Sequence, residues 1–165
     1  MEHSFGKECA LGLVEREVVE FFVRMANVLN LPRSVGEIYG VLFVSSKPLC
    51  LDDCRALLGI SKGSTSQGLR ILRSFGAIRT VYVPGDRKDY HIAETSLRKI
   101  VSGFAKEQIQ PHVVSGKERV QRIRELLEDH KVDNPDDMRE KIDMLENWQK
   151  RANSVLPLVL KLIGK

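Results

Sequence analysis

The sequence predicts a mainly α-helical protein that contains one small β-hairpin. Two observations predict this fold class. Apolar residues recur every three or four positions over most of the chain, which is the period of a helix with one buried face. In contrast, AIRTVYV, which begins at Ala77, is β-branched and aromatic, and YHIA resumes the extended pattern at Tyr90. The intervening PGDRKD contains the Pro and Gly of a turn, so the two segments read as a hairpin.

The N-terminal part predicts two helices. The first runs from about Glu8 to Leu29 and is ended by Pro32. Its apolar positions have helical spacing, at Leu11, Val14, Val18, Phe21, Phe22, Met25 and Val28. In the second helix, Ser34 and Glu37 have the spacing of a capping box.

A short third helix and a fourth helix follow with almost no connection between them. The third helix is expected to start at Asp52 or Asp53, which suit N-cap chemistry, and to end at Gly59. Ser61 is the expected N-cap of the fourth helix. Two helices joined so tightly, with Gly in the turn, fit a helix-turn-helix, and the hairpin after them makes it a winged helix-turn-helix.

From Ser96 onward the pattern is helical. One segment is expected to end at Pro111, with one face formed by Leu97, Val101 and Phe104. The last helix begins with Asn134 as its cap and Pro135 at its first position, and Pro157 should kink or break it. Its tail, VLPLVLKLI, is apolar nearly all round, so another chain or the core should cover it.

The front half of the fourth helix is built from residues that form helices poorly. The stretch SKGSTSQG, which starts at Ser61, is almost entirely small hydroxyl residues and glycine. If Thr65, Leu69 and Leu72 face inward, Gly63, Gln67, Arg70 and Ser74 face outward, flanked by Ser64 and Ser66. A bare helix start lets base edges and phosphates of a duplex approach closely. In the simpler alternative, the glycines only relieve crowding.

Positive charge is concentrated at this helix and the hairpin. The 165-residue chain carries 26 Lys and Arg against 22 Asp and Glu, a net charge of +4. Between Gly59 and Tyr90 there are six basic and only two acidic residues, so the rest of the chain is balanced. A phosphate backbone is attracted to such a segment.

We therefore expect a DNA interface made by the fourth helix and the hairpin tip. Gln67 can pair with adenine and Arg70 with guanine or a phosphate, while the N–H groups of the helix start can hold a phosphate. Arg87 or Lys88 would reach the flanking minor groove. The expected interface residues are Ser61, Lys62, Gly63, Ser64, Ser66, Gln67, Arg70, Ser74, Arg87 and Lys88. The simpler reading of the hairpin is a solvated turn.

Three segments carry a family resemblance: RSVGEIYG from Arg33, GISKGSTSQGLR from Gly59 and VPGDRKDY from Val83. They resemble the GbsR branch of the MarR-type transcriptional regulators. The resemblance implies a winged-helix repressor or activator that forms a homodimer and binds palindromic operators. It also implies a link to quaternary-ammonium osmoprotectants and thus a choline-like small effector.

The chain departs from this family at two positions. Thr65 stands where this branch usually has Val, and its hydroxyl can bond back to the helix. MarR-type wings tend to show Asp-x-Arg, but the residue two after Asp86 is Lys88. The choice between Arg87 and Lys88 as the residue that enters the minor groove is therefore open.

The expected organisation has three regions. Residues 1–31 form a helix for dimerisation and the core, residues 32–95 form the winged DNA-binding domain, and residues 96–165 form a helical dimerisation region. The expected dimer contacts are Leu11, Val14, Val18, Ile142, Leu145, Trp148, Leu156 and Val159.

The remaining features point away from other classes of function. Catalytic and metal-binding constellations are not evident, so we expect no enzyme, no cofactor and no metal. No apolar run reaches the about 18 residues of a membrane span, and three cysteines without framework spacing favour a cytoplasmic protein. The alternatives are a winged-helix docking module of the transcription machinery, RNA binding, and a redox-sensing regulator that uses Cys50 or Cys54. Aromatic side chains at helical spacing are more simply core than an effector pocket.

Overall fold

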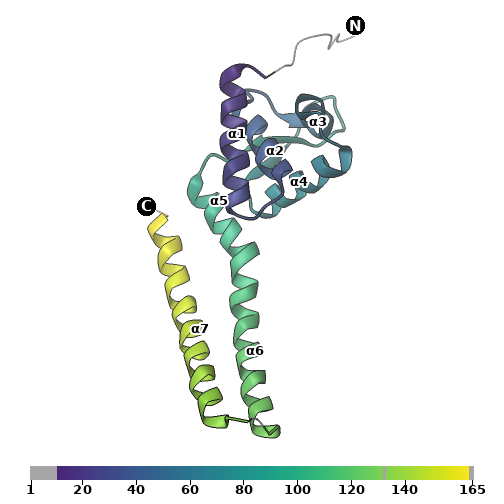
Figure 1. Ribbon diagram of the computed structural model, residues 1–165. Coiled ribbons are helices and arrows are strands. Elements are labelled where there is room, and N and C mark those ends of the chain that lie inside the picture. The colour runs from purple at the N-terminus through teal and green to yellow at the C-terminus, as the bar shows by residue number, and fades with distance from the viewer. Residues whose placement is uncertain (1–10, 132, 164–165) are drawn as a thin grey trace. The chain divides into compact units, whose positions relative to one another are not determined.

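The computed structural model describes residues 11–131 and 133–163. The chain divides into two compact units, Met1–Ser96 and Leu97–Lys165, which we describe separately (Figure 1). The first unit contains, in order, α1 (Leu13–Val28), α2 (Arg33–Val44), β1 (Leu49–Cys50), α3 (Leu51–Leu58), α4 (Lys62–Ser74), β2 (Ile78–Val81) and β3 (Tyr90–Ala93). This order confirms the predicted fold class, in which a helix-turn-helix is followed by a hairpin.

Helix α1 packs along α2 at very short range. Val19, Val23 and Ala26 are its buried residues. A Cβ atom at Gly36 would lie 2.5 Å from the carbonyl oxygen of Phe22, and one at Gly40 would lie 2.7 Å from the Cα of Val19. The two helices can come this close only because α2 has no side chain at these two positions.

The apolar residues noted in the first helix do not form one buried face. The described helix begins at Leu13, and residues 8–10 of the expected helix lie outside the described residues. Most of the apolar positions noted at helical spacing are exposed in this chain, namely Val14, Phe21, Met25 and Val28. Because α1 has apolar residues on two faces, spacing alone could not identify the face that contacts α2.

Two of the expected helix caps are also wrong. The N-cap of α2 is Pro32, which has no side-chain acceptor, so Ser34 lies inside the helix rather than at its cap. Glu37 accepts a hydrogen bond from Arg33 Nε at 2.7 Å. The N-cap of α3 is Cys50, and Asp53 in the first turn accepts a hydrogen bond from the Cys50 N–H at 2.9 Å. Asp53 is thus the third residue of α3, and its carboxylate caps the backbone N–H of the residue before the helix.

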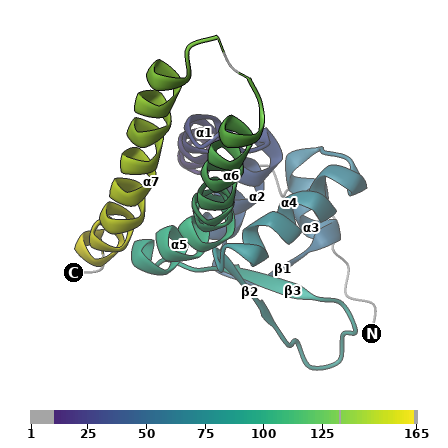
Figure 2. The same cartoon turned by 90° about the horizontal axis from the view of Figure 1, so that it is seen from below.

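The hairpin belongs to a three-stranded antiparallel sheet of order β1-β3-β2. Strand β1 pairs Leu49 with His91, and β2 pairs Ile78 with Ala93. Figure 2 shows the hairpin of β2 and β3 projecting from the unit, with residues 82–89 at its far end. We call this hairpin with its loop the wing. Strand β1 was not predicted.

The second unit contains α5 (Leu97–Phe104), a π-helical turn η1 (Ala105–Ile109), α6 (Gln110–Asp129) and α7 (Pro135–Ile163). The expected helix end at Pro111 is wrong. Pro111 is in the first turn of α6, where its missing N–H is tolerated, and the π-helical turn precedes it. Leu97, which was predicted to share a helix face with Val101 and Phe104, is 67% exposed.

Helix α7 lies beside α6 and forms a helical hairpin with it (Figures 1 and 2). The predicted cap is confirmed, because Asn134 Oδ1 accepts a hydrogen bond from the Asp137 N–H at 3.4 Å. Arg124 of α6 bridges Asp143 and Glu146 of α7, at 2.7 and 2.8 Å. Pro157 lies inside α7 and does not break it. None of the helices among the described residues has both the length and the apolar character of a membrane span.

Candidate nucleic-acid interface

The turn between α3 and α4 is fixed by local contacts. Gly59 ends α3 with a φ of 65°, a left-handed conformation that favours glycine. Ser61 Oγ accepts a hydrogen bond from the Ser64 N–H at 3.1 Å and thereby caps α4. Thr65 is fully buried, and its hydroxyl donates to the Ser61 carbonyl at 2.9 Å. The predicted Gly59 end and Ser61 cap are both confirmed.

Helix α4 presents a polar, uncluttered face to solvent. Thr65, Leu69 and Leu72 are buried, as the predicted inward face requires. The interface residues predicted at this helix are all exposed, both at its start (Ser61 and Lys62) and on or beside its outward face, namely Gly63, Ser64, Ser66, Gln67, Arg70 and Ser74. A duplex could therefore contact any of these side chains.

The two glycines in the front half of α4 have different structural roles. A Cβ at Gly68 would lie 2.5 Å from Ile38 Cδ1, so this glycine allows α4 to pack on α2. At Gly63 a Cβ would meet only Ser61 Oγ, at 3.9 Å. Relief of crowding within the chain therefore explains Gly68, and it does not explain Gly63.

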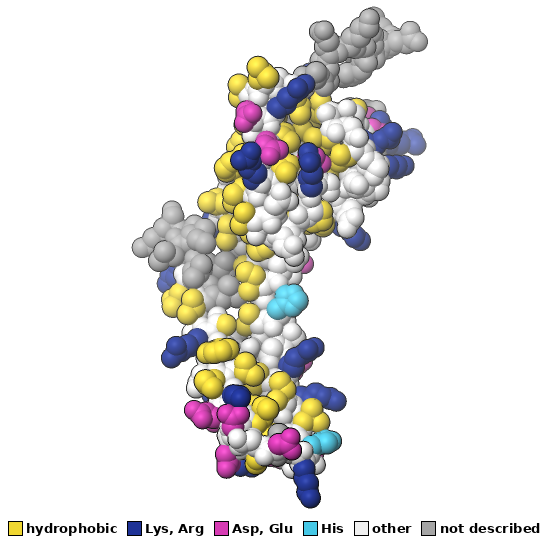
Figure 3. All heavy atoms as spheres, in the orientation of Figure 1, with side chains coloured by type: hydrophobic (Ala, Val, Ile, Leu, Met, Phe, Trp, Pro, Cys, Tyr) yellow, Lys and Arg dark blue, Asp and Glu magenta, His cyan; other side chains and the backbone are white. Residues whose placement is uncertain are grey.

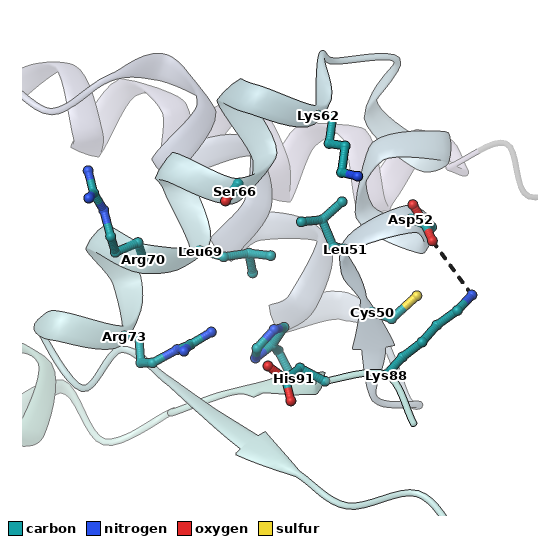
Figure 4. Close-up of a pocket in the computed structure, with 11 residues that line it drawn as sticks. Cys50, Leu51, Asp52, Lys62, Ser66, Leu69, Arg70, Arg73, Lys88 and His91 are labelled. Atoms are coloured by element: carbon teal, nitrogen blue, oxygen red, sulfur yellow. Dashed lines mark ion pairs between the residues drawn. The ribbon is translucent and has the colours of Figure 1, made fainter. Parts of the chain in front are cut away.

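A groove of about 490 Å³ lies between α4, the start of α3 and the wing (Figure 4). We call it the wing groove. Its lining includes the four basic side chains Lys62, Arg70, Arg73 and Lys88, against two acidic ones, Asp52 and Asp89. The excess of basic side chains makes the groove suited to a phosphate backbone.

Sequence reasoning missed Arg73 as a lining residue of this groove. It follows Arg70 by three positions and Ser66 by seven, so it shares their side of α4. Figure 4 shows Arg73 near His91 at the base of the groove. Helical spacing from Ser66 and Arg70 was the available signal.

His91 forms part of the groove floor and is buried. Its Nδ1 lies 3.4 Å from Thr80 Oγ1 on the neighbouring strand. Burial, and then the nearby Arg73 cation, hold the pKa of His91 below its usual range. At neutral pH, His91 is therefore an uncharged side chain beneath the basic rim.

Asp86 organises the wing loop. Its Oδ1 accepts a hydrogen bond from the Lys88 N–H at 3.0 Å, and its Oδ2 accepts one from the Tyr90 hydroxyl at 2.8 Å. These bonds lower the pKa of Asp86 and raise the pKa of Tyr90 to about 12. Asp86 is thus held as a carboxylate, and the loop on either side of it has a defined conformation.

The segment GISKG, from Gly59, matches the short GxSxG pattern of serine hydrolases. The sequence-based expectation of no enzyme overlooked this match. In those enzymes the serine lies on a turn between a strand and a helix. Here Ser61 lies between two helices, and its hydroxyl donates to Ser64 Oγ at 3.0 Å. Ser61 is placed as a helix cap rather than as a nucleophile.

The two described cysteines are poorly placed for redox chemistry. Cys50 and Cys54 are free and buried. Burial raises the pKa of Cys50, and it raises the pKa of Cys54 to about 12. Since the thiolate is the reactive form, the redox alternative loses support at these two positions. No group of three or more potential metal ligands occurs among the described residues.

The residues expected at a dimer interface have different surroundings. Val14, Leu145 and Trp148 are exposed, and Leu11 and Val18 are half-buried. Ile142 is only 2% exposed within its own chain, so it is not available to a partner. Leu156 and Val159 belong to α7, but their side chains lie outside the described part of the structure. Figure 3 shows hydrophobic side chains at the surface of both units.

The aromatic residues of the first unit pack against one another, but they are only partly core, because Phe21 and Phe43 are 58% and 44% exposed. Phe22 contacts the rings of Phe21, Tyr39 and Phe43, with ring centroids 4.7–5.2 Å apart. The Tyr39 hydroxyl donates to the Glu94 carbonyl at 2.6 Å. These rings pack α1 against α2, and nothing in their arrangement distinguishes an effector site from core.

A helix-turn-helix with an exposed second helix, a wing and a basic groove between them defines the winged-helix class of regulators. No family model matches the chain. The chain is similar, however, to the HTH-type transcriptional repressor OpcR of Bacillus subtilis (strain 168), at 26% identity over 60% of this chain and 56% of OpcR. It is also similar to the HTH-type transcriptional repressor GbsR of the same organism, at 26% identity over 84% of this chain and 83% of GbsR.

A solved structure described as that of a transcriptional regulator shares the fold. It covers 90% of this chain and 99% of its own, with a TM-score of 0.53 and 22% sequence identity. The chain spans little more than half the length of OpcR and most of the length of GbsR. Together these similarities confirm the resemblance to the GbsR branch of winged-helix transcriptional regulators.

Proposed function

We propose that this protein is a sequence-specific DNA-binding transcriptional regulator. One observation carries the proposal: the exposed front of α4 lies beside a groove lined by four basic side chains. The relatives OpcR and GbsR are named as transcriptional repressors, which favours repression over activation.

In this proposal α4 enters the major groove. Gln67 pairs with an adenine and Arg70 with a guanine or a phosphate, while the free N–H groups at the start of α4 hold a phosphate. Gly63 has no side chain and the serines beside it have small ones, so the backbone of α4 can approach the duplex closely. Lys62 and Arg73 at the wing groove neutralise the adjacent phosphates.

We further propose a homodimer that binds a palindromic operator. The support is the exposed apolar surface of the second unit, where Leu145, Trp148 and Val155 are 40%, 64% and 52% exposed. With Ala152 they follow each other at spacings of three, four and three residues, as in the contact seam of a coiled coil. In such a dimer, two copies of α4 about 34 Å apart would read half-sites one helical turn apart.

Two further parts of the proposal rest on the resemblance alone. One is a small effector, such as a choline-like osmoprotectant, that shifts the population between two dimer geometries. The other is a regulated gene connected with such a compound. We also propose a cytoplasmic location, which three cysteines without framework spacing favour.

The proposed DNA binding is tested by selecting duplexes from a randomised library with the purified protein and measuring affinity for a selected duplex by fluorescence anisotropy. Arg70→Ala should weaken binding by about fivefold or more and relax base preference at one position. Arg122→Ala, which removes an exposed cation from α6, is the matched control and should leave the preference unchanged.

Salt dependence and the choice of nucleic acid together separate this proposal from its rivals. Binding through several phosphates should weaken steeply between about 50 and 200 mM salt. A protein-docking module would retain no duplex from the library, and an RNA-binding protein would prefer the corresponding RNA. Either result would refute the proposal.

A further inference from the structure

The wing carries two adjacent basic residues that have different contacts. Lys88 Nζ lies 3.6 Å from Asp52 Oδ2 at the start of α3, as Figure 4 shows. The backbone N–H of Lys88 is also held by Asp86. By contrast, within the part of the chain that the structure describes, Arg87 is exposed and its guanidinium forms no ion pair. The Lys88 side chain thus extends toward the Asp52 carboxylate, whereas the Arg87 side chain has no such partner among the residues described.

The two side chains also differ in the hollows that they border: Lys88 borders two, and Arg87 borders only one of them. Lys88 lines the wing groove together with Lys62, Arg70 and Arg73 of α4. A second hollow, of about 640 Å³, is formed by the wing itself and is lined by residues 80–82 and 85–89. Arg87 lines this second hollow and not the wing groove. Lys88 lines both hollows and so also adjoins the cations of α4, whereas Arg87 lines only the hollow of the wing.

The pair between Lys88 and Asp52 does not prevent Lys88 from binding a phosphate. Both side chains are more than half exposed, and an exposed ion pair at this distance is weak. A phosphate beside α4 can replace Asp52 as the partner of Lys88 while Lys88 stays where it is.

Resting on the proposed function, we infer that Arg87 is the residue that enters the minor groove and that Lys88 contacts the DNA backbone beside α4. The chemistry of the two side chains agrees with this division. A guanidinium is more weakly hydrated than an ammonium and is favoured in the narrow minor groove of A·T-rich DNA. An ammonium is a point charge that binds a phosphate without regard to sequence.

The test uses a duplex selected by the wild-type protein, made in two versions whose flanks are rich in A·T or in G·C. We expect the wild-type protein to bind the A·T version more tightly, by about fivefold or more. Arg87→Ala should remove this preference, and so should Arg87→Lys, although it keeps the charge. Lys88→Ala should weaken binding by the same factor on both versions and reduce the salt slope by about 0.9.

Arg122→Ala in α6 serves as the control and should match the wild-type protein on both duplexes. The inference is overturned if the flank preference survives in Arg87→Ala, or if it disappears in Lys88→Ala. It is also overturned if the wild-type protein binds a selected duplex with no flank preference at all. A wild-type protein that retains no duplex would instead refute the proposed function, and this inference with it.

Discussion

Gly36 and Gly40 show how single residues determine the packing of the first unit. They are four positions apart on α2, so they lie on the same side of the helix and one turn from each other. The backbone of α1 occupies the space that their side chains would need. The segment RSVGEIYG was noted as a motif, but its glycines could not be explained from sequence because the element they contact lies elsewhere in the chain.

Gly36→Ala should destabilise the protein strongly. The new Cβ would meet backbone atoms of Phe22 and Val23 at 2.5–2.7 Å, and a helix backbone cannot move aside as a side chain can. We expect a loss of about 2 kcal/mol or more in the free energy of unfolding, measured by urea denaturation. A Gly36→Ala protein as stable as the wild type would show that α1 does not pack on α2 this closely.

At the scale of the element, α4 was predicted well because its signals are local. The Gly59 end, the Ser61 cap and the buried positions all lie within a few residues of one another. Strand β1 was not predicted, because it is two residues long and forms only by pairing with His91 and Tyr90, far along the chain. The buried face of α1 could not be derived from spacing for a related reason, because α2 decides which apolar face is covered.

Gly63→Ala distinguishes the two explanations for the small residues in the first half of α4, which are close approach of DNA and relief of crowding within the chain. Alanine forms helices better than glycine, and the added Cβ meets nothing closer than Ser61 Oγ at 3.9 Å. The free energy of unfolding of the variant should therefore exceed that of the wild type by about 0.5–1 kcal/mol. If α4 approaches DNA as proposed, the same change should weaken binding to the selected duplex, measured by anisotropy. A variant that is more stable and binds equally well would contradict a role of Gly63 in the approach to DNA.

At the scale of the whole molecule, the candidate interface was predicted in part. The residues of α4 were identified because they share one helix and one face. The wing groove was not foreseen, because it forms where the start of α3, α4 and β3 meet, and its lining by Asp52, Arg73 and His91 depends on that meeting. The dimer contacts were predicted from hydrophobicity, which could not separate Ile142, buried within its own chain, from the exposed Trp148.

Trp148 is the side chain on which we expect the proposed dimer to depend most. It is 64% exposed, and it lies between Leu145 and Ala152 in the apolar seam of α7. A large aromatic side chain buried at an interface commonly contributes about 2 kcal/mol or more to association. Trp148→Glu should therefore raise the dissociation constant of the dimer by about thirtyfold or more, measured by sedimentation at a series of protein concentrations.

Tyr82→Glu provides the matched control, since Tyr82 is an even more exposed aromatic residue, at 81%, and lies in the wing rather than on α7. It should leave the dissociation constant of the dimer unchanged.

Trp148→Glu should also weaken binding to a duplex with two half-sites, because only a dimer gains from both of them. Binding to a single half-site should stay close to that of the wild-type protein. A Trp148→Glu protein that dimerises as the wild type does would exclude the α7 seam as the dimer contact, while leaving α4 as the DNA-contacting helix.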